Sequence, residues 1–302
     1  QHSTEPPNTL PSNLTLRTMD SVAEKARSVF ELSFLEATVS GFLLAVWYVG
    51  SLYAWNFIFP EEKSLPRDNS KVIRRRFISV GTVCAIGFLY AWMWIREEAT
   101  VWDFLIALGI RTDYWVQAAV LPTLLTAILF LGPLFQSVTD PEEDDDEGSI
   151  QEVWRQMRRG SLIPWRNLVV GPITEEVVFR SLMGALLMAG GWSPTAVIWF
   201  SPIFFGVAHL HHVFTGTAVA VVVFQLLYTT VFGWMASFFF LRTGHMIAPI
   251  LVHGFCNHQG FPAFNYILDH PKKYLVIGAY VLGVIAFFAL LFPLTAPSIY
   301  GM

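Results

Sequence analysis

The sequence predicts an all-α polytopic membrane protein, and three observations support that fold class. Of the 302 residues, 54% are hydrophobic and only 14% are charged, whereas a soluble domain carries about 25% charged residues. The mean hydropathy is +0.50. The apolar residues also occur in runs of about 20, which is the length that a helix needs to cross a bilayer. An ordinary soluble globule is therefore excluded.

Eight apolar segments follow one another along the chain, and the seventh is short and polar for its depth. They lie at about 34–58, 77–95, 115–135, 172–190, 193–212, 217–241, 245–261 and 274–296. No internal repeat and no linker rich in Gly, Ser or Pro divides them. We therefore predict a polar N-terminal arm at 1–33 and a single transmembrane domain at 34–302, with about eight transmembrane helices in one bundle.

The loops between these segments indicate an orientation and exclude one class of partner. Most of the 19 Lys and Arg residues fall in the loop at 60–76, in the loop before residue 172 and near residue 272. Because such residues concentrate on the cytosolic side, we expect these loops to be cytosolic and both chain ends to face the lumen. An acidic run at 140–147 is expected to be a solvated loop. The net charge of -4 gives no basic face for nucleic acid.

Ionisable side chains inside apolar segments mark functional sites because a charge in lipid is costly. The first cluster lies in GPITEEVVFR. Pro172 favours the first turn of a helix, so we predict a helix start there, with the helix dipole supporting both glutamates. Glu176 and Arg180 are four residues apart and predict an ion pair, whereas Glu175 points about 100° away and is available for proton chemistry. The alternative is a salt-bridge network that only braces helices.

Two further polar clusters lie in later apolar segments. In FFGVAHLHH, His209 follows Phe205 by four residues, and a lone histidine is as consistent with packing as with catalysis. In HGFCNHQGFP, His253 and Asn257 are four residues apart and share a helical face. Polar contacts between helices are the alternative role. Glycines and prolines around this segment predict irregular backbone, which membrane proteins tolerate where it lines a cavity.

Together these side chains predict hydrolytic acyl transfer in an intramembrane catalytic cavity. Under the predicted topology, Glu175 and His209 fall in the same half of the bilayer. A carboxylate and an imidazole that face a wet cavity can activate water. A second histidine and a carboxamide, His253 and Asn257, can donate hydrogen bonds to a developing oxyanion.

The three clusters resemble the type II CAAX prenyl endopeptidases, the Ras-converting enzymes of the CPBP/ABI superfamily of intramembrane proteases. Their signature is EExxxR, then FxxxH, then HxxxN. This chain has all three in order, as Glu175-Glu176 with Arg180, Phe205 with His209, and His253 with Asn257. One such motif arises easily by chance, but three in separate apolar helices are specific. The resemblance spans about 162–265, which predicts the catalytic core.

The resemblance implies an enzyme of the endoplasmic reticulum membrane with its active site open to the cytosol. Such an enzyme removes the C-terminal tripeptide from farnesylated or geranylgeranylated CAAX proteins, Ras-like GTPases among them, without a cofactor or a metal. The prenyl chain already partitions into membrane lipid, which suits a lipid-facing opening. The implied roles are water activation for Glu175 and His209, oxyanion binding for His253 and Asn257, and site organisation or substrate binding for Glu176, Arg180 and Phe205.

Three alternatives stay open on the sequence alone. Cys256 would be a nucleophile beside His253 or His209, although apolar surroundings disfavour the thiolate. Glu175, His209 and His253 would form a zinc site with one open position, although the chain has no HExxH motif. A membrane transporter or a non-catalytic scaffold of the same superfamily would use the buried charges for a proton relay or a binding pocket.

Overall fold

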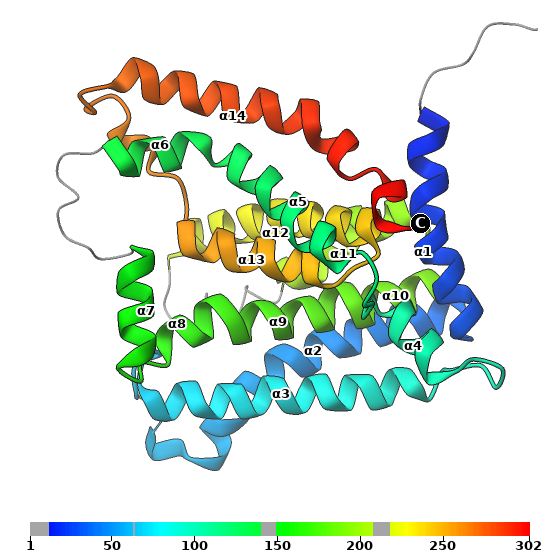
Figure 1. Cartoon of the computed structure of the whole chain (residues 1–302). Helices are drawn as coiled ribbons and strands as arrows, with labels where there is room; N and C mark the ends of the chain where they lie inside the picture. Colours follow the sequence, from blue (N-terminus) through cyan, green and yellow to red (C-terminus); the bar gives the residue numbers. More distant parts are fainter. Residues whose placement is uncertain (1–11, 63, 140–148, 208–217) are drawn as a thin grey trace, which may run out of the picture.

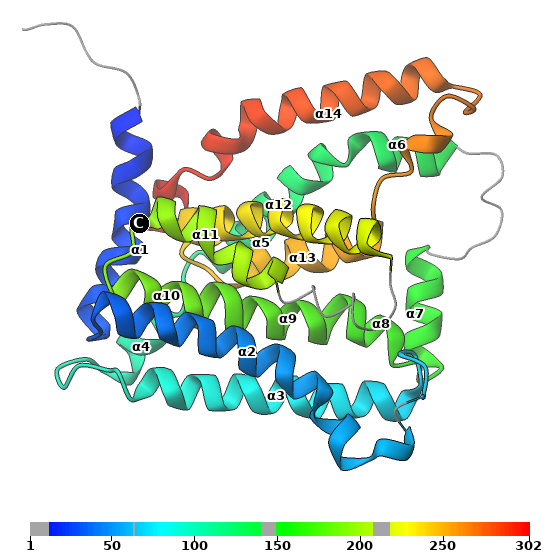
Figure 2. The ribbon, with the colours of Figure 1, turned by 180° about the vertical axis from the view of Figure 1, so that it is seen from behind.

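The computed structural model describes residues 12–62, 64–139, 149–207 and 218–302, and every regular element among them is a helix (Figures 1 and 2). In chain order the longer helices are α1 (Ser12–Val29), α2 (Phe34–Ile58), α3 (Ser70–Trp92), α4 (Val101–Ala107), α5 (Trp115–Leu129), α6 (Leu131–Thr139), α7 (Ile150–Arg158), α11 (Pro194–Val207), α12 (Val219–Thr243), α13 (Ile247–Gln259) and α14 (Lys273–Leu294). A central run between α7 and α11 consists of α8 (Ile163–Trp165), η2 (Arg166–Val170), α9 (Gly171–Glu176), η3 (Val177–Leu182) and α10 (Met183–Ala189).

Three helices in the described part of the chain are long and apolar enough to cross a membrane: α2, α12 and α14. The pair α5 and α6, bent by 66° at a short break, makes a fourth if it forms one span. Gly132 and Pro133 follow that break, and proline is favoured in the first turn of a new helix. The protein is thus an all-α, multi-pass membrane protein.

The expected number of about eight spans is not established. A helix lies at each of the eight positions, but α3 carries Arg74, Arg75 and Arg76 near its start, and α13 has only 13 residues. The apolar helix at the fifth position is likewise short. By length and composition, three to four helices of the described chain qualify as spans.

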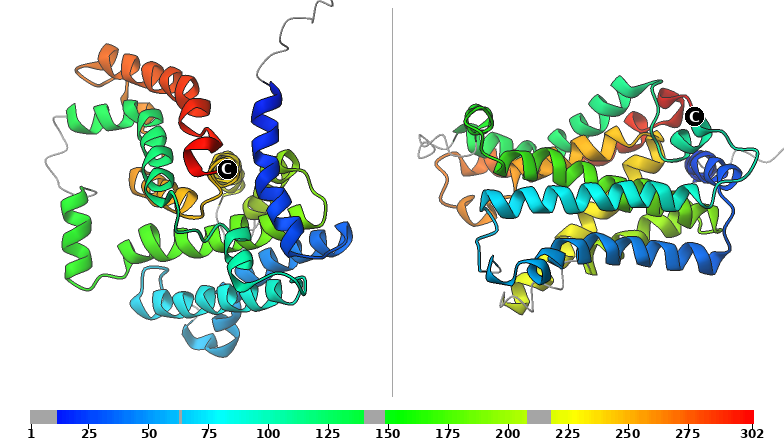
Figure 3. Two further views of the ribbon diagram at one scale, coloured as in Figure 1. Left: turned by 45° about the vertical axis from the view of Figure 1, so that its right-hand side comes forward. Right: turned by 90° about the horizontal axis from the view of Figure 1, so that it is seen from below.

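Two helices lie across the ends of the bundle, one at each end (Figures 1 and 3). At one end α7 has no buried residues and finishes in basic side chains. At the other end α1 packs against α10 and α4. The loop before α3 lies at the α7 end, together with the start of the central run, whereas α4 lies at the α1 end.

Much of the segment expected as a polar arm belongs to α1 and packs into the core. The buried side chains are Met19, Val22, Ala23, Ala26 and Val29, and they join the main hydrophobic cluster. They recur every three or four residues, which places them on one face of a helix. Because polar residues separate these apolar positions, α1 contains no continuous apolar run, and the sequence does not predict it as a buried helix.

The central run is one helical path from Ile163 to Ala189, and the predicted helix start at Pro172 is wrong. Helical backbone continues through Val170 and Gly171, and the segments η2 and η3 are π-helical. Pro172 lacks the backbone N–H that would pair with Asn167 O in this path, and the side chain of Asn257 supplies that donor. The glutamates therefore do not lie in a first helical turn, so the expected support from a helix N-terminus does not apply.

Candidate functional site

His253 joins both glutamates of the EExxxR motif. Its Nδ1 lies 2.7 Å from Glu176 Oε1, and its Nε2 lies 3.8 Å from Glu175 Oε2. The same Oε1 of Glu176 accepts a hydrogen bond of 3.1 Å from Arg180 Nη1. A carboxylate paired with arginine only accepts hydrogen bonds, so the Nδ1 of His253 carries the hydrogen. The ion pair predicted from the four-residue spacing is present, and it extends to the histidine.

The pair and its histidine are buried, whereas Glu175 is not. Glu176 has an exposed fraction of 0%, Arg180 of 2% and His253 of 6%, while the Glu175 side chain is 26% exposed. The Phe232 ring covers this group, with its centroid 4.7 Å from that of His253. Low surrounding polarity strengthens such charge-assisted hydrogen bonds. The buried carboxylate of Glu176 thus holds His253 in place, whereas the carboxylate of Glu175 is partly exposed to solvent.

The two π-helical segments flank the glutamates. Glu175 and Glu176 end α9, and Arg180 lies in η3. Single π turns inside helices often occur at functional sites. The neighbouring helix α12 approaches closely here because Gly233 has no side chain. A Cβ at that position would lie 2.5 Å from Pro202 Cβ and 3.2 Å from Arg180 Nη2.

Pro172 explains how α13 is docked against the central run. In the π-helical register the carbonyl of Asn167 would pair with the N–H of residue 172, which proline lacks. Asn257 supplies that donor instead, with its Nδ2 2.8 Å from Asn167 O. One turn away, a Cβ on Gly254 would lie only 2.9 Å from Leu168 O. The HxxxN motif is therefore tied to η2 by one hydrogen bond and by close backbone packing at Gly254.

Glu175 and Asn257 line the same cavity, which has a volume of about 220 Å³. Its walls come from α2, α3, η2, α9, α12 and α13 and from the loop before α3. Tyr48 closes part of the wall, and its hydroxyl lies 3.0 Å from Thr174 Oγ1. Three arginines also line the cavity: Arg67, Arg76 and Arg166. The carboxylate of Glu175, the carboxamide of Asn257 and three guanidinium groups thus line one cavity.

The structure brings together most of the side chains that the sequence singles out. Glu175, Glu176, Arg180 and His253 form one connected group, with Asn257 on the shared cavity. Phe205 lies in α11. His209 and the acidic run at 140–147 lie outside the described residues, so one of the three ligands of the alternative zinc set, His209, is not described. Cys256 is a free thiol and is not among the residues that line the cavity.

Sequence reasoning missed the wall of the cavity. Tyr48 is a polar residue inside the first apolar segment, which was a usable signal because its hydroxyl needs a partner when buried. Arg67, Arg76 and Arg166 entered the sequence analysis only as charges that orient the chain. Gln225, a polar side chain on α12, lines the cavity as well.

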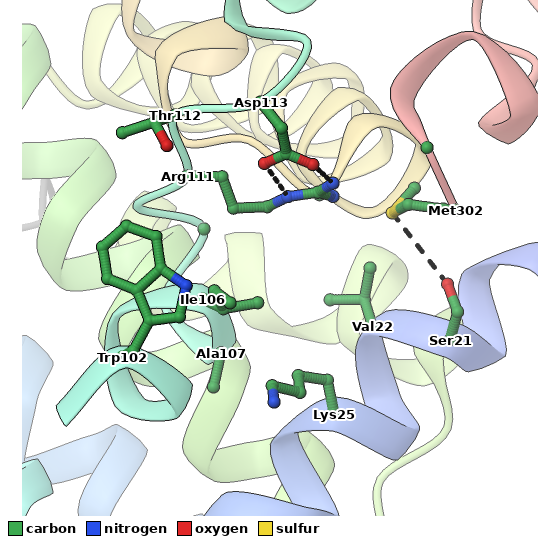
Figure 4. Close-up of a pocket in the computed structure, with 13 residues that line it drawn as sticks. Ser21, Val22, Lys25, Trp102, Ile106, Ala107, Arg111, Thr112, Asp113 and Met302 are labelled. Carbon is green, nitrogen blue, oxygen red and sulfur yellow. Dashed lines mark hydrogen bonds and ion pairs between the residues drawn. The ribbon is translucent and has the colours of Figure 1, made fainter. Parts of the chain in front are cut away.

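A second cavity of about 540 Å³ lies at the α1 end of the bundle (Figure 4). None of the motif residues lines it. Its charged side chains are already paired, Arg111 with Asp113 and Lys25 with Asp103. The cavity that contains Glu175 is therefore the candidate active site.

The fold and the site define a class of protein, a multi-pass membrane protein with a buried Glu–Arg–His group beside a cavity. The family profile described as type II CAAX prenyl endopeptidase Rce1-like matches residues 160–258. CAAX prenyl protease 2 of Homo sapiens is 41% identical over 276 residues, which cover 85% of this chain and 80% of that protein.

Two more distant relatives carry the same name. CAAX prenyl protease 2 of Arabidopsis thaliana is 34% identical, covering 85% of this chain and 89% of that protein. The protein of Saccharomyces cerevisiae is 26% identical, covering 72% and 78%. No solved structure matches the chain. The chain belongs to the type II CAAX prenyl endopeptidase family, a family of membrane proteases.

Proposed function

We propose that this protein removes the C-terminal tripeptide from prenylated CAAX proteins, using water that Glu175 and His209 activate. The relatives named CAAX prenyl protease 2 support the reaction. The assignment of Glu175 as the group that activates water rests on the difference between the two neighbouring glutamates. Glu176 is buried and bound to Arg180 and His253, whereas Glu175 is partly exposed on the cavity.

In the proposed reaction, Glu175 accepts a proton from water as the water oxygen attacks the scissile carbonyl. The carbon–nitrogen bond then breaks, and the proton passes to the departing amine. His209 is the second group that orients or deprotonates the water. The new carboxylate stays on the prenylated cysteine, and the tripeptide leaves as a free amine.

The oxyanion that forms in this step is proposed to be held by His253 and Asn257. The Asn257 amide has two N–H groups, and only one donates to Asn167 O. With Nδ1–H of His253 donated to Glu176, its Nε2 faces Glu175. In this proposal, that nitrogen donates a hydrogen bond to the oxyanion, and the contact with Glu176 fixes the direction in which the ring points. Glu176 and Arg180 therefore position the histidine.

The substrates are proposed to be farnesylated or geranylgeranylated proteins such as Ras-like GTPases, reached in the endoplasmic reticulum membrane. A prenyl chain enters from lipid, at about 0.8 kcal/mol per buried CH₂, while the peptide enters from water. Cationic side chains gather at the cavity and on α7. Because basic residues favour the cytosolic side, we propose that the cavity opens to the cytosol.

The test is cleavage of a synthetic farnesylated CAAX peptide by the purified protein in detergent. We expect the wild type and Cys256→Ala to release the tripeptide with or without a chelator. We expect Glu175→Gln to lose activity by about 10²- to 10⁴-fold, the usual contribution of a general base, while its melting temperature stays close to that of the wild type. Full activity of Glu175→Gln, or loss of wild-type activity in chelator that zinc restores, would refute the mechanism. A folded wild type that cleaves nothing would favour a transporter or a scaffold.

A further inference from the structure

Three arginines line the cavity that contains Glu175, and their positive charge exceeds the negative charge of the acidic side chains on its wall. Arg67 comes from the loop before α3, Arg76 from α3 and Arg166 from η2, and all three line it. These residues are distant in sequence, so the fold gathers them. The cavity holds a single acidic residue among its lining side chains, Glu175.

Arg166 is already partnered. Its Nη1 lies 2.7 Å from Asp68 Oδ1 and 3.2 Å from Arg67 O, and its Nε lies 2.9 Å from Asn167 Oδ1. Its side chain is 13% exposed. Arg166 therefore holds the loop before α3 against η2, and its positive charge is paired with the carboxylate of Asp68.

Arg67 and Arg76 differ from Arg166 in this respect. Among the described residues, neither guanidinium forms an ion pair with a carboxylate. Burial and then the neighbouring Arg166 lower the pKa of Arg67, while Asp68 and Glu175 raise it. The charges of Arg67 and Glu175 thus act on one another across the cavity. Two cations without a carboxylate partner among the described residues, on one cavity, suit a bound anion.

We propose that Arg67 and Arg76 bind the C-terminal carboxylate of the substrate. This inference rests on the proposed function. An arginine fork matches a carboxylate in shape and charge. An extended tripeptide spans about 10 Å, and the arginines line the same cavity as Glu175. A carboxylate held at the arginines would leave the bond three residues upstream within this cavity, where Glu175 lies. The two arginines then act as positioning residues that set where the chain is cut.

This arrangement has a consequence for specificity. A substrate whose terminal carboxylate is masked as an amide loses the charge that the arginines recognise, while its scissile bond and prenyl group are unchanged. A hydrogen bond to a charged group contributes more than one between neutral groups. The wild type should therefore prefer the free acid over the amide, and that preference should depend on Arg67 and Arg76.

The experiment compares two farnesylated CAAX peptides of one sequence, one with a free C-terminal carboxylate and one with a C-terminal amide. For the wild type, we expect kcat/KM to be about 10- to 100-fold higher for the acid. Arg67→Gln and Arg76→Gln should each lower kcat/KM for the acid more than for the amide, mainly through KM, so that the preference for the acid shrinks. Arg76→Lys should retain part of the preference, because it keeps the charge without the fork.

Arg74→Gln is the matched control, because Arg74 is an exposed arginine on the same helix and does not line the cavity. It should keep the wild-type preference. Equal losses for acid and amide in Arg67→Gln and Arg76→Gln would overturn the inference, since such losses indicate a structural role. Equal wild-type cleavage of both peptides would overturn the inference alone. If a folded wild type cleaved neither peptide, the proposed function would fail and this inference with it.

Discussion

His253 donates a hydrogen bond of 2.7 Å to the fully buried carboxylate of Glu176. This contact orients the ring so that its other nitrogen faces Glu175, 3.8 Å away. One glutamate of the pair therefore fixes the histidine, and the histidine in turn is aligned with the other glutamate. Each of these side chains should respond differently to substitution.

Glu176→Gln should destabilise the protein and lower its activity. The substitution leaves Arg180 buried without its carboxylate, and breaking a buried pair in this way costs about 3–5 kcal/mol. Thermal unfolding in detergent would measure the loss. The control is Glu31→Gln, which removes an exposed pair with Arg96 and should cost no more than about 1 kcal/mol. A Glu176→Gln protein as stable as the wild type would show that the buried pair contributes nothing.

Gly254→Ala should separate α13 from the central run. The new Cβ would lie 2.9 Å from Leu168 O, and that contact involves backbone that cannot rotate away. We expect lower stability and a lower kcat, because His253 and Asn257 move with α13. Gly278→Ala is the control, since a Cβ there meets nothing within 4 Å. If both variants kept wild-type kcat and melting temperature, the close approach would have no role in the site.

Asn257→Ala separates the structural role of this residue from its proposed chemical role. Loss of the hydrogen bond to Asn167 O should cost about 1 kcal/mol of stability. Loss of an oxyanion donor should lower kcat by about 10²- to 10³-fold. The neighbouring Gln259→Ala should change neither. A stability loss with unchanged kcat would assign Asn257 to helix docking alone.

His245 should make stability depend on pH. Burial, and next the charge of Arg111, lower the pKa of this histidine from 6.5 to about 4, against the opposing charge of Asp113. As the pH falls, the unfolded chain takes up a proton on His245 at a higher pH than the folded protein does. The contribution of His245 to the free energy of unfolding is therefore fully present above pH 6.5 and is lost as the pH falls toward 4. Melting temperatures between these pH values should fall more steeply for the wild type than for His245→Gln. Parallel curves would show that His245 does not titrate in this way.

The sequence predicted the polar core of the site because its contacts are short in sequence or follow helical periodicity. Glu176 and Arg180 pair at four residues, and apolar segments mark the helices that carry the other motif residues. The helix start at Pro172 was misplaced because a π-helical turn shifts hydrogen bonding without leaving a mark in hydrophobicity. The packing of α1 was missed because its apolar residues are spaced rather than continuous.

The cationic wall of the cavity was beyond sequence reasoning for a different reason. Arg67 and Arg166 lie far apart in the chain, and the fold brings them together so that Arg166 Nη1 donates a hydrogen bond to Arg67 O. From the sequence, the positions of arginines predict which side of the membrane a loop occupies, but they do not predict which arginines line one cavity. Only the packed arrangement of α2, α3, η2 and α13 distinguishes Arg76 from the exposed Arg74.

The most direct test of the central claim is a single turnover of the wild type in water enriched in oxygen-18, with enzyme in excess over the farnesylated peptide. Attack by water that Glu175 activates predicts one solvent oxygen in the new carboxylate of the prenylated cysteine in that first turnover. It also predicts no label in the enzyme. Label in the Glu175 carboxylate, with an unlabelled first product, would contradict the account by showing that this residue attacks the substrate itself.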